Sequence, residues 1–347
     1  QPIANAIVWQ DRRTADFCAA LKDAGHEDMV RTRTGLLLDP YFSATKMRWL
    51  LDHEPAVAAA AAQGTLAFGT IESWLLWNLT GAAAHLTDAT NASRTLLLAL
   101  DGADWDADLC DLFGVPRFAL PEIRDNAGAL GMTDPALLGA AIPVTGMAGD
   151  QQAATIGQGC LFPGESKATY GTGAFVLANM GTDVPRSANR MLGTVLWQIG
   201  GRRCYALEGS VFVAGSLIKW LRDSLGLIAS ADETEQLARS VPDNGGVVLV
   251  PAHSGLGAPH WQPQARGSIS GLSLSTGKAE IVRAALEAMA HQTRDLAGAF
   301  AADGARWTCL KVDGGMVAND WMVQDIADLL EIRSEEHTSE LQSLSHL

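Results

Sequence analysis

The sequence lacks the features that mark several common classes of protein. Aromatic residues make up only 6% of its 347 positions, and no apolar run reaches the roughly 20 residues that a membrane-spanning helix needs. It contains no Gly-x-x-x-x-Gly-Lys-Ser/Thr motif, which excludes the P-loop kinases. The histidines do not have the spacing of metal ligands, so a zinc site is not expected.

Cysteine is also scarce, and its spacing excludes the chemistry that pairs of cysteines perform. The five cysteines are Cys18, Cys110, Cys160, Cys204 and Cys309. No two are close enough in sequence to form a zinc knuckle or a redox pair, and none is accompanied by the base motif of a thiol enzyme. The odd number of cysteines suits a reducing compartment and no secretory signal is visible, so we expect a cytoplasmic protein.

Basic residues are fewer than acidic ones. The chain has 25 Lys and Arg against 39 Asp and Glu, a formal net charge of −14. Such a surface repels nucleic acid and anionic membranes, so we expect neither as a partner. It also repels ATP on average. A nucleotide site in this chain would therefore depend on local backbone N–H groups and a metal ion, because no basic field is available.

What the sequence does have is a long alternation of apolar strands and helices, typical of an α/β protein with two domains. We expect the boundary near residues 157–163, which gives domains at 1–158 and 159–332. The predicted helices are 12–24, 45–53, 70–79, 151–157, 212–225, 233–240, 278–302 and 319–330. The predicted strands are 142–148, 167–170, 174–178, 191–198, 203–206, 247–250 and 310–312. The second and third strands would form a hairpin.

The two ends of the sequence break this pattern. Gln1 is not an initiator residue. Residues 333–347 are polar and have no apolar periodicity, and their first eleven residues resemble one reading frame of a DNA-sequencing adapter. We expect 333–347 to be a non-native tail, with an ordinary solvated terminus as the alternative, and we leave it out of the predicted fold.

Asp150 is the most informative single residue. It follows the apolar strand at 142–147 and comes just before a predicted helix, beside Gln151 and Gln152. A carboxylate at the end of a strand can accept the proton of a bound hydroxyl group, which makes Asp150 a candidate general base. The alternative is an ordinary helix N-cap, where Asp is common.

Two glycine-rich turns are candidates for binding a phosphate. Gly171-Thr172-Gly173 lies between two predicted strands, and Asp313-Gly314-Gly315 lies between a strand and a helix. Glycines let a ligand approach the backbone closely, and exposed N–H groups can bind an anion. Each motif alone is also compatible with a simple hairpin or a strand-to-helix turn. Together with Asp150 they suggest phosphoryl transfer from a nucleotide to an alcohol.

These runs resemble the FGGY carbohydrate kinases from about residue 6 to residue 332. The run from Tyr41 to His53, YFSATKMRWLLDH, is similar to the first signature of that family, and the run from Gly267 to Glu287 is similar to the second. Further runs are similar to the members that phosphorylate glycerol, namely WQDRRT at 9–14, DPYF at 39–42, TD at 87–88 with NASRT at 91–95, GDQQ at 149–152, TYGTG at 169–173 and GLGAP at 255–259. The resemblance implies two actin-like (ribonuclease H-like) domains with a ligand cleft between them, both incomplete here.

The resemblance also implies roles for individual residues. Asp150 would be the general base and would lie near Mg²⁺, through water. The residues that would bind glycerol are Trp9, Tyr41, Asp150, Gln151 and Phe175. The residues that would bind ATP are Thr172, Gly215, Lys219, Gly315 and Asn319. Lys219 departs from the pattern, because a glutamine is expected near the adenine. By analogy, a homo-oligomer (dimer or tetramer) is expected of the complete protein.

The family's opening segment and the end of its second domain are missing from the sequence, so we expect the chain as written to have little or no kinase activity. One alternative is a kinase of the same family that acts on another polyol or a ketose. The other is a non-catalytic actin-like module that binds a nucleotide without transferring phosphate.

Overall fold

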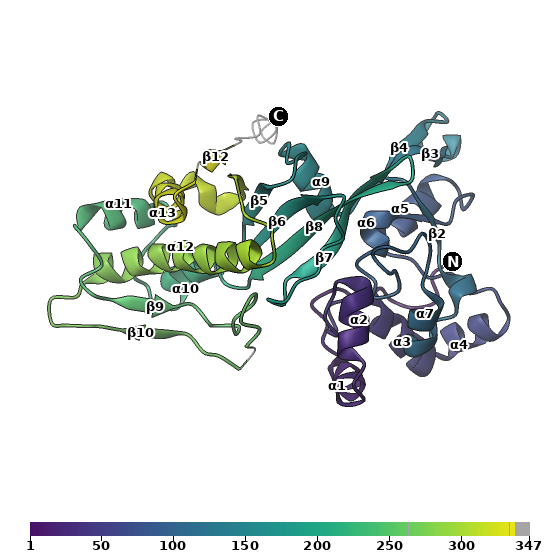
Figure 1. Cartoon of the computed structure of the whole chain (residues 1–347), viewed down its shortest axis with the longest axis horizontal. Coiled ribbons are helices and arrows are strands. Elements are labelled where there is room, and N and C mark those ends of the chain that lie inside the picture. The colour runs from purple at the N-terminus through teal and green to yellow at the C-terminus, as the bar shows by residue number, and fades with distance from the viewer. Residues whose placement is uncertain (263, 333, 337–347) are drawn as a thin grey trace. The chain divides into compact units, whose positions relative to one another are not determined.

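The computed structural model describes residues 1–262, 264–332 and 334–336. The described chain forms two compact units (Figure 1). The first unit consists of residues 1–154, 181–186 and 192–206, and the second of residues 155–180 and 187–191 with the described residues from 207 onwards. The chain therefore returns to the first unit twice after leaving it, and the domain boundary near residues 157–163 stays a prediction.

The first unit is mainly helical. Its elements in chain order are α1 (Ala15–Asp23), α2 (Glu27–Thr34), α3 (Ser43–His53), α4 (Pro55–Ala62), α5 (Ile71–Leu79), β1 (Leu86–Asp88), α6 (Ala89–Ala92), α7 (Ala107–Phe113), η1 (Arg117–Ala119), β2 (Glu122–Arg124), β3 (Ala127–Met132), α8 (Pro135–Leu138), β4 (Pro143–Gly146), the start of α9 (Asp150–Gly157), β7 (Leu192–Ile199) and the start of β8 (Arg202–Val211). Strand β1 pairs in parallel with β2, and β3 pairs in antiparallel with β4.

Two non-helical segments contribute a group of buried leucines to the core of the first unit. Residues 36–38 and 96–98 are Leu-Leu-Leu runs, and all six side chains are buried. Backbone bonds tie these segments to their neighbours, because the N–H of Leu100 donates to the carbonyl of Arg33 and that of Gly193 donates to the carbonyl of Gly35. Burial of each leucine contributes roughly 1.5–3 kcal/mol, so these runs stabilise the first unit.

The second unit combines a sheet with helices. Its elements are the end of α9, β5 (Glu165–Tyr170), β6 (Ala174–Gly181), the end of β8, α10 (Gly215–Asp223), α11 (Glu233–Ser240), β9 (Val248–Val250), β10 (Ser268–Ser270), α12 (Lys278–Ala302), β11 (Cys309–Asp313), η2 (Gly315–Ala318), α13 (Asp320–Leu330) and β12 (Ser334–Glu336). Its sheet has the strand order β12-β11-β5-β6-β8. Strand β11 is parallel to β5, and β5 is antiparallel to β6.

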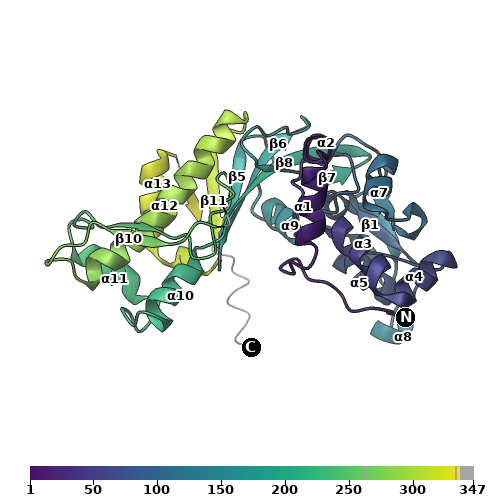
Figure 2. The same cartoon turned by 90° about the horizontal axis from the view of Figure 1, so that it is seen from below.

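Helix α12 shows why this unit packs as it does. Buried side chains recur at helical spacing along its whole length, from Val282 through Leu286, Met289 and Leu296 to Phe300. This stripe faces one common core, and α12 packs against α11 and α13, beside which it runs in Figures 1 and 2. Its first turn is closed by Glu280, whose Oε2 accepts the N–H of Gly277 at 2.9 Å. A negative charge at that end of a helix is favourable.

Most predicted elements are present within a few residues, including the long helix at 278–302 and the hairpin, which is β5–β6. The three- and four-residue elements β1, α6, η1, β2, α8, β10 and η2 were not predicted, and neither were the longer α2, α4, α7 and β3. Three- or four-residue elements carry no periodic signal, and a parallel pair such as β1–β2 depends on a distant partner. Of the predicted tail at 333–347, residues Ser334–Glu336 form β12, parallel to β11. The remainder lies outside the described residues, and the non-native origin of the segment stays a prediction.

Candidate active site

Asp150 is the first residue of helix α9 and follows strand β4 by a short connection. The side chain is exposed, and its Oδ1 accepts the N–H of Gln151 at 2.8 Å. An N-cap carboxylate would accept a bond from a residue two or three positions further on. A carboxylate has about four lone-pair sites, so this single bond leaves capacity at Oδ2 for a ligand. The geometry is suitable for a general base.

A buried polar network fixes the connection before Asp150. Asp88 is fully buried, and its carboxylate accepts bonds from the backbone and side chains of Thr90 and Asn91 and from Asn126 Nδ2 at 2.9 Å. Asn126 Nδ2 also donates to the carbonyl of Met147 at 2.8 Å, and its own carbonyl accepts the N–H of Met147. A buried carboxylate is stable only when it is bonded in this way.

The same network reaches the residue next to Asp150. The N–H of Gly149 donates to Thr90 Oγ1 at 2.8 Å. On the other side, the buried Gln152 donates from Nε2 to Thr194 Oγ1 at 3.0 Å, and Thr194 contacts Ser93 Oγ at 3.0 Å. Asp150 therefore lies between two anchored residues, Gly149 and Gln152, which fixes the position of its backbone.

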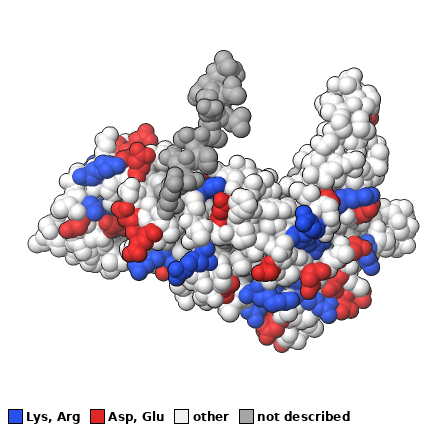
Figure 3. All heavy atoms as spheres, turned by 45° about the horizontal axis from the view of Figure 1, so that its top comes forward, with Lys and Arg blue, Asp and Glu red and all other residues white. Residues whose placement is uncertain are grey.

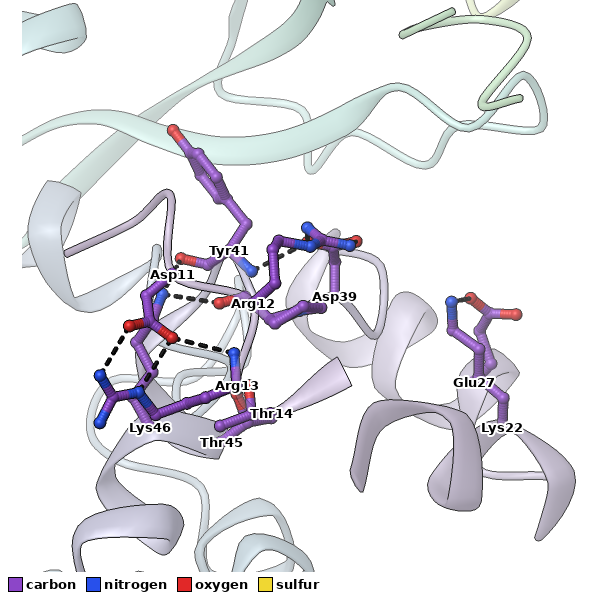
Figure 4. Close-up of polar contacts among 11 residues, drawn as sticks. Asp11, Arg12, Arg13, Thr14, Lys22, Glu27, Asp39, Tyr41, Thr45 and Lys46 are labelled. Atoms are coloured by element: carbon purple, nitrogen blue, oxygen red, sulfur yellow. Dashed lines mark hydrogen bonds and ion pairs between the residues drawn. The ribbon is translucent and has the colours of Figure 1, made fainter. Parts of the chain in front are cut away.

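Trp9 and Tyr41 lie together in the first unit. Their rings meet edge to face with 5.5 Å between centroids, and Trp9 is 54% exposed. The guanidinium of Arg94 lies 5.8 Å from the centre of the Tyr41 ring. The backbone N–H of Tyr41 donates to Asp39 Oδ1 at 2.8 Å, as Figure 4 shows. An exposed tryptophan packed on a half-buried tyrosine can line a small-molecule site.

The predicted nucleotide residues lie in the second unit, where two loops meet through their backbones. The N–H groups of Ala214 and Ser216 donate to the carbonyl of Thr172 at 3.0 and 3.1 Å, and that of Gly215 donates to the carbonyl of Gly171 at 2.8 Å. A Cβ atom on Gly215 would lie only 2.5 Å from that carbonyl oxygen. The start of α10 can approach the β5–β6 turn this closely only because residue 215 is glycine.

A third loop joins the same place. Gly314 has φ +98°, and a Cβ atom there would lie 2.5 Å from the carbonyl oxygen of Tyr170. The next residue, Gly315, is exposed, and Met316 lies near Gly215. The turn after β5, the start of α10 and the loop after β11 therefore converge. Their glycines leave backbone without side-chain cover, the arrangement in which N–H groups can contact a phosphate.

The remaining predicted residues have mixed positions. Asn319 is 9% exposed, and its side chain caps α13 by accepting the N–H of Met322 and donates to Thr234. Lys219 is an exposed residue of α10. Phe175 is half-buried on β6, opposite Thr169 of β5. A ligand contact for each of these three stays a prediction.

Charge is distributed without a broad basic field on the face shown in Figure 3, where basic and acidic side chains of the described residues are interspersed. Within the described part of the chain, no group of three or more His, Cys, Asp or Glu could hold a metal ion.

Glu72 is a buried carboxyl group whose Oε1 accepts hydrogen bonds from Thr70, Ser73 and Thr87. Burial raises its pKa above the ordinary value of 4.5 despite these bonds.

The sequence did not reveal the residues that position the site, because their bonding partners are distant along the chain. Asn126 had no signal at all, because it acts on Met147 and Asp88 from another strand connection. Asp88 lay in a run that carried the resemblance but received no individual role, and in the structure it caps α6. Lys46 and Arg94 lay in runs that carried the resemblance but received no individual role.

Comparison with known proteins identifies both halves of the chain. Residues 1–157 match the model of the amino-terminal domain of the FGGY family of carbohydrate kinases, and residues 166–336 match the model of its carboxy-terminal domain. No helix among the described residues has the length and apolar character of a membrane span.

Individual proteins agree with the family models. The chain is 58% identical over 332 residues to a glycerol kinase of Rhodospirillum centenum, and 59% identical over 332 residues to one of Alcanivorax borkumensis. These alignments cover 96% and 95% of this chain, and the chain spans 67% of the length of each relative.

A solved structure is similar as well. The crystal structure of Plasmodium falciparum glycerol kinase with ADP matches with a TM-score of 0.94 at 36% identity, covering 99% of this chain and 69% of that one. The predicted α/β fold of two actin-like, ribonuclease H-like domains is thereby confirmed. The chain belongs to the FGGY family of carbohydrate kinases.

Proposed function

We propose that this chain carries the active-site residues of an ATP-dependent glycerol kinase, which converts glycerol to sn-glycerol 3-phosphate. The observation that carries the proposal is the match over 95% or more of the chain to relatives named glycerol kinase. The anchored carboxylate of Asp150 supports it from the structure, because an alcohol substrate needs a base at the reacting hydroxyl group.

The reaction is an in-line displacement at phosphorus. The terminal hydroxyl oxygen of glycerol forms a bond to the γ-phosphorus of ATP, and the bond from that phosphorus to the β,γ-bridging oxygen breaks. The hydroxyl proton passes to the carboxylate of Asp150, and ADP leaves with the bridging oxygen. Catalysis then depends mainly on positioning and on stabilising charge, as is general for phosphoryl transfer.

The glycerol contacts would come from side chains. The edge-to-face pair of Trp9 and Tyr41 would lie against the carbon chain, with the Tyr41 hydroxyl as a hydrogen-bond partner. Gln151 follows Asp150 directly and would bind a second hydroxyl group. Phe175 would complete the apolar wall.

The nucleotide contacts would come from backbone. The converging loops at Thr172, Gly215 and Gly315 would present N–H groups and the Thr172 hydroxyl to the phosphates. Lys219 and Asn319 would lie toward the nucleoside. A single exposed carboxylate fits a hydrated Mg²⁺, which usually binds one or two carboxylates together with substrate phosphates. Asp150 would hold the ion through water, and the ion would supply charge neutralisation at the phosphates.

Two alternatives remain open to test. Another polyol or a ketose could replace glycerol, because the matching family is one of carbohydrate kinases in general. A non-catalytic nucleotide-binding module is the second alternative, although it would have no use for an anchored carboxylate at an alcohol site.

The test measures ADP formation with ATP, Mg²⁺ and a panel of polyols and ketoses. The chain as it stands is assayed beside a chimaera that adds the remaining third of a relative's length. Our expectation of little activity in the 347-residue chain is thereby tested directly. Glycerol-dependent turnover that is lost in Asp150→Asn supports the proposal. Turnover on a different alcohol changes the substrate, and nucleotide binding without transfer in the chimaera contradicts the proposal.

A further inference from the structure

The loop that carries Tyr41 is bonded at every polar atom of the two peptide groups that flank its Cα. Lys46 Nζ donates to the carbonyl of Pro40 at 2.6 Å and to the carbonyl of Tyr41 at 3.1 Å. Asp39 Oδ1 accepts the N–H of Tyr41 at 2.8 Å, and the carbonyl of Asp39 accepts the N–H of Phe42 at 3.2 Å. The backbone dihedral angles of Tyr41, and so the direction of its side chain, follow from these bonds.

Lys46 is an unusual residue to find in this place. It is 6% exposed and lies on α3 between the buried Thr45 and Met47. A buried ammonium group is unfavourable unless its protons are bonded, and an apolar residue of similar length would fill the same space. Asp11 and Asp39 attract the ammonium group and Arg12 repels it, while burial lowers the pKa of Lys46. Filling this space does not require an ammonium group, so the charge of Lys46 indicates a role beyond packing.

Lys46 and Asp39, the two residues that hold the Tyr41 loop and that we call the clamp, are themselves anchored. Asp39 is held by Arg12, whose Nη1 lies 2.8 Å from Asp39 Oδ1. Helix α3 is held at Thr45, whose hydroxyl meets that of Thr14 at 2.8 Å in the core. Figure 4 shows the outcome, with the Tyr41 ring directed away from Lys46 and Asp11. Lys46 and Asp39 bond to the backbone of the loop, and the phenol ring of Tyr41 lies on the opposite side.

We propose that Lys46 is a positioning residue for the polyol, which it influences through Tyr41 and does not touch. The identity of the ligand rests on the proposed function, whereas the holding of the loop does not. Removing the ammonium group frees the carbonyls of Pro40 and Tyr41 and lets the Tyr41 side chain turn. Misplacement of a binding group by about 1 Å can lower a rate by about a hundredfold.

The first measurement needs no ligand. Hydrogen exchange of the Tyr41 and Phe42 amides is followed in the wild-type chain, in Lys46→Met and in Lys22→Met. Lys22 is the matched control, because it is a surface lysine that pairs with Glu27 at 3.5 Å, to the side of the clamp in Figure 4. We expect exchange to become about tenfold faster in Lys46→Met only, as a charge-assisted bond is lost. Equal exchange in all three proteins would overturn the inference.

The second measurement is kinetic and uses the preparation that turns over glycerol. In Lys46→Met, kcat/KM for glycerol should fall by about ten- to a hundredfold while KM for ATP is unchanged. Lys46→Arg should recover part of the loss, because a guanidinium group can still donate to a carbonyl. Equal effects on glycerol and ATP, or no effect, would refute a positioning role.

Two further outcomes are covered, namely that Lys46→Met does not fold and that no preparation turns over glycerol. If Lys46→Met does not fold, Lys46→Gln keeps a polar amide NH2 but is shorter than lysine and uncharged, so it should show the same selective effect on glycerol. If no preparation turns over glycerol, the polyol part of the inference falls with the proposed function. The exchange result then decides separately whether Lys46 holds the loop.

Discussion

The two units prepare their candidate sites in opposite ways. In the first unit, side chains do the positioning: Asp88 and Asn126 anchor the connection to Asp150, and Lys46 and Asp39 clamp the Tyr41 loop. In the second unit, backbone meets backbone at Gly215 and Gly314, where a side chain would not fit. A small polyol has hydroxyl groups to be matched one by one, whereas a phosphate can be bound by any suitably directed N–H group. The contrast suggests that specificity belongs to the first unit.

The strongest test of this contrast removes the carboxylate at the centre of the first unit. Asp150→Asn should lower kcat for glycerol phosphorylation by roughly a thousandfold, within the range for loss of a general base. KM for ATP should change little, since the nucleotide loops are untouched. Asp111→Asn, an exposed acid of α7, is the control and should behave as wild type. Retained turnover in Asp150→Asn would show that another group accepts the proton.

The second unit is tested by adding one methyl group. Gly215→Ala places Cβ against the carbonyl oxygen of Gly171, so the loops must separate. Overpacking of this kind typically costs about 1–3 kcal/mol. We expect a lower Tm and a higher KM for ATP, with KM for glycerol nearly unchanged.

The matched control for this change is Gly298→Ala. Gly298 lies inside α12, and a Cβ atom there would meet nothing within 4 Å. Alanine in a helix is roughly 0.5–1 kcal/mol more favourable than glycine. This variant should therefore be slightly more stable than wild type, and equal losses in both glycine variants would contradict the backbone account.

A smaller effect concerns the buried carboxyl group of the first unit. The folded-state pKa of Glu72 is above its ordinary value of 4.5, so the folded state binds the proton more tightly than the unfolded state. The stability that this group contributes is fully present below pH 4.5 and is lost as pH rises through the raised pKa. Glu72→Gln lacks this titration.

Urea unfolding from pH 4 to pH 8 tests this difference. The stability of wild type relative to Glu72→Gln should decline as pH rises. Glu122→Gln, which changes an exposed acid of β2, should keep the wild-type pH dependence. Parallel pH profiles for wild type and Glu72→Gln would show that the buried carboxyl group does not titrate in this range.

The smallest effect is expected at the cysteines, which report on both units at once. Burial raises the pKa of Cys18, Cys110, Cys160 and Cys204 to about 11. Thiolate is therefore scarce at pH 8, and alkylation of these four should be slow in the folded protein and complete in denaturant. Peptide mapping after a timed reaction with iodoacetamide gives the rates. Fast labelling confined to one unit would show that this unit opens more readily.

Local pattern was enough for most of the fold. Apolar positions at helical spacing predict α12 from residue 278 to residue 302, and the glycine turn at 171–173 predicts the β5–β6 hairpin. These elements depend on neighbours within a few residues, which a single sequence displays. The pairing of β1 with β2 joins Leu86 to Glu122, and nothing in either short segment indicates the other.

The candidate site divides in the same way. By itself the sequence determined the chemical types: an acid at a strand end in Asp150, bare backbone at Gly171 and Gly315, and the motifs that resemble one kinase family. Only the tertiary structure decided which groups hold these residues in place. Asn126 reaches Met147, Gly215 meets Gly171, and the ammonium group of Lys46 spans two carbonyls. Burial and hydrogen bonding between distant segments are properties of the folded chain, because each needs a partner that the local sequence does not contain.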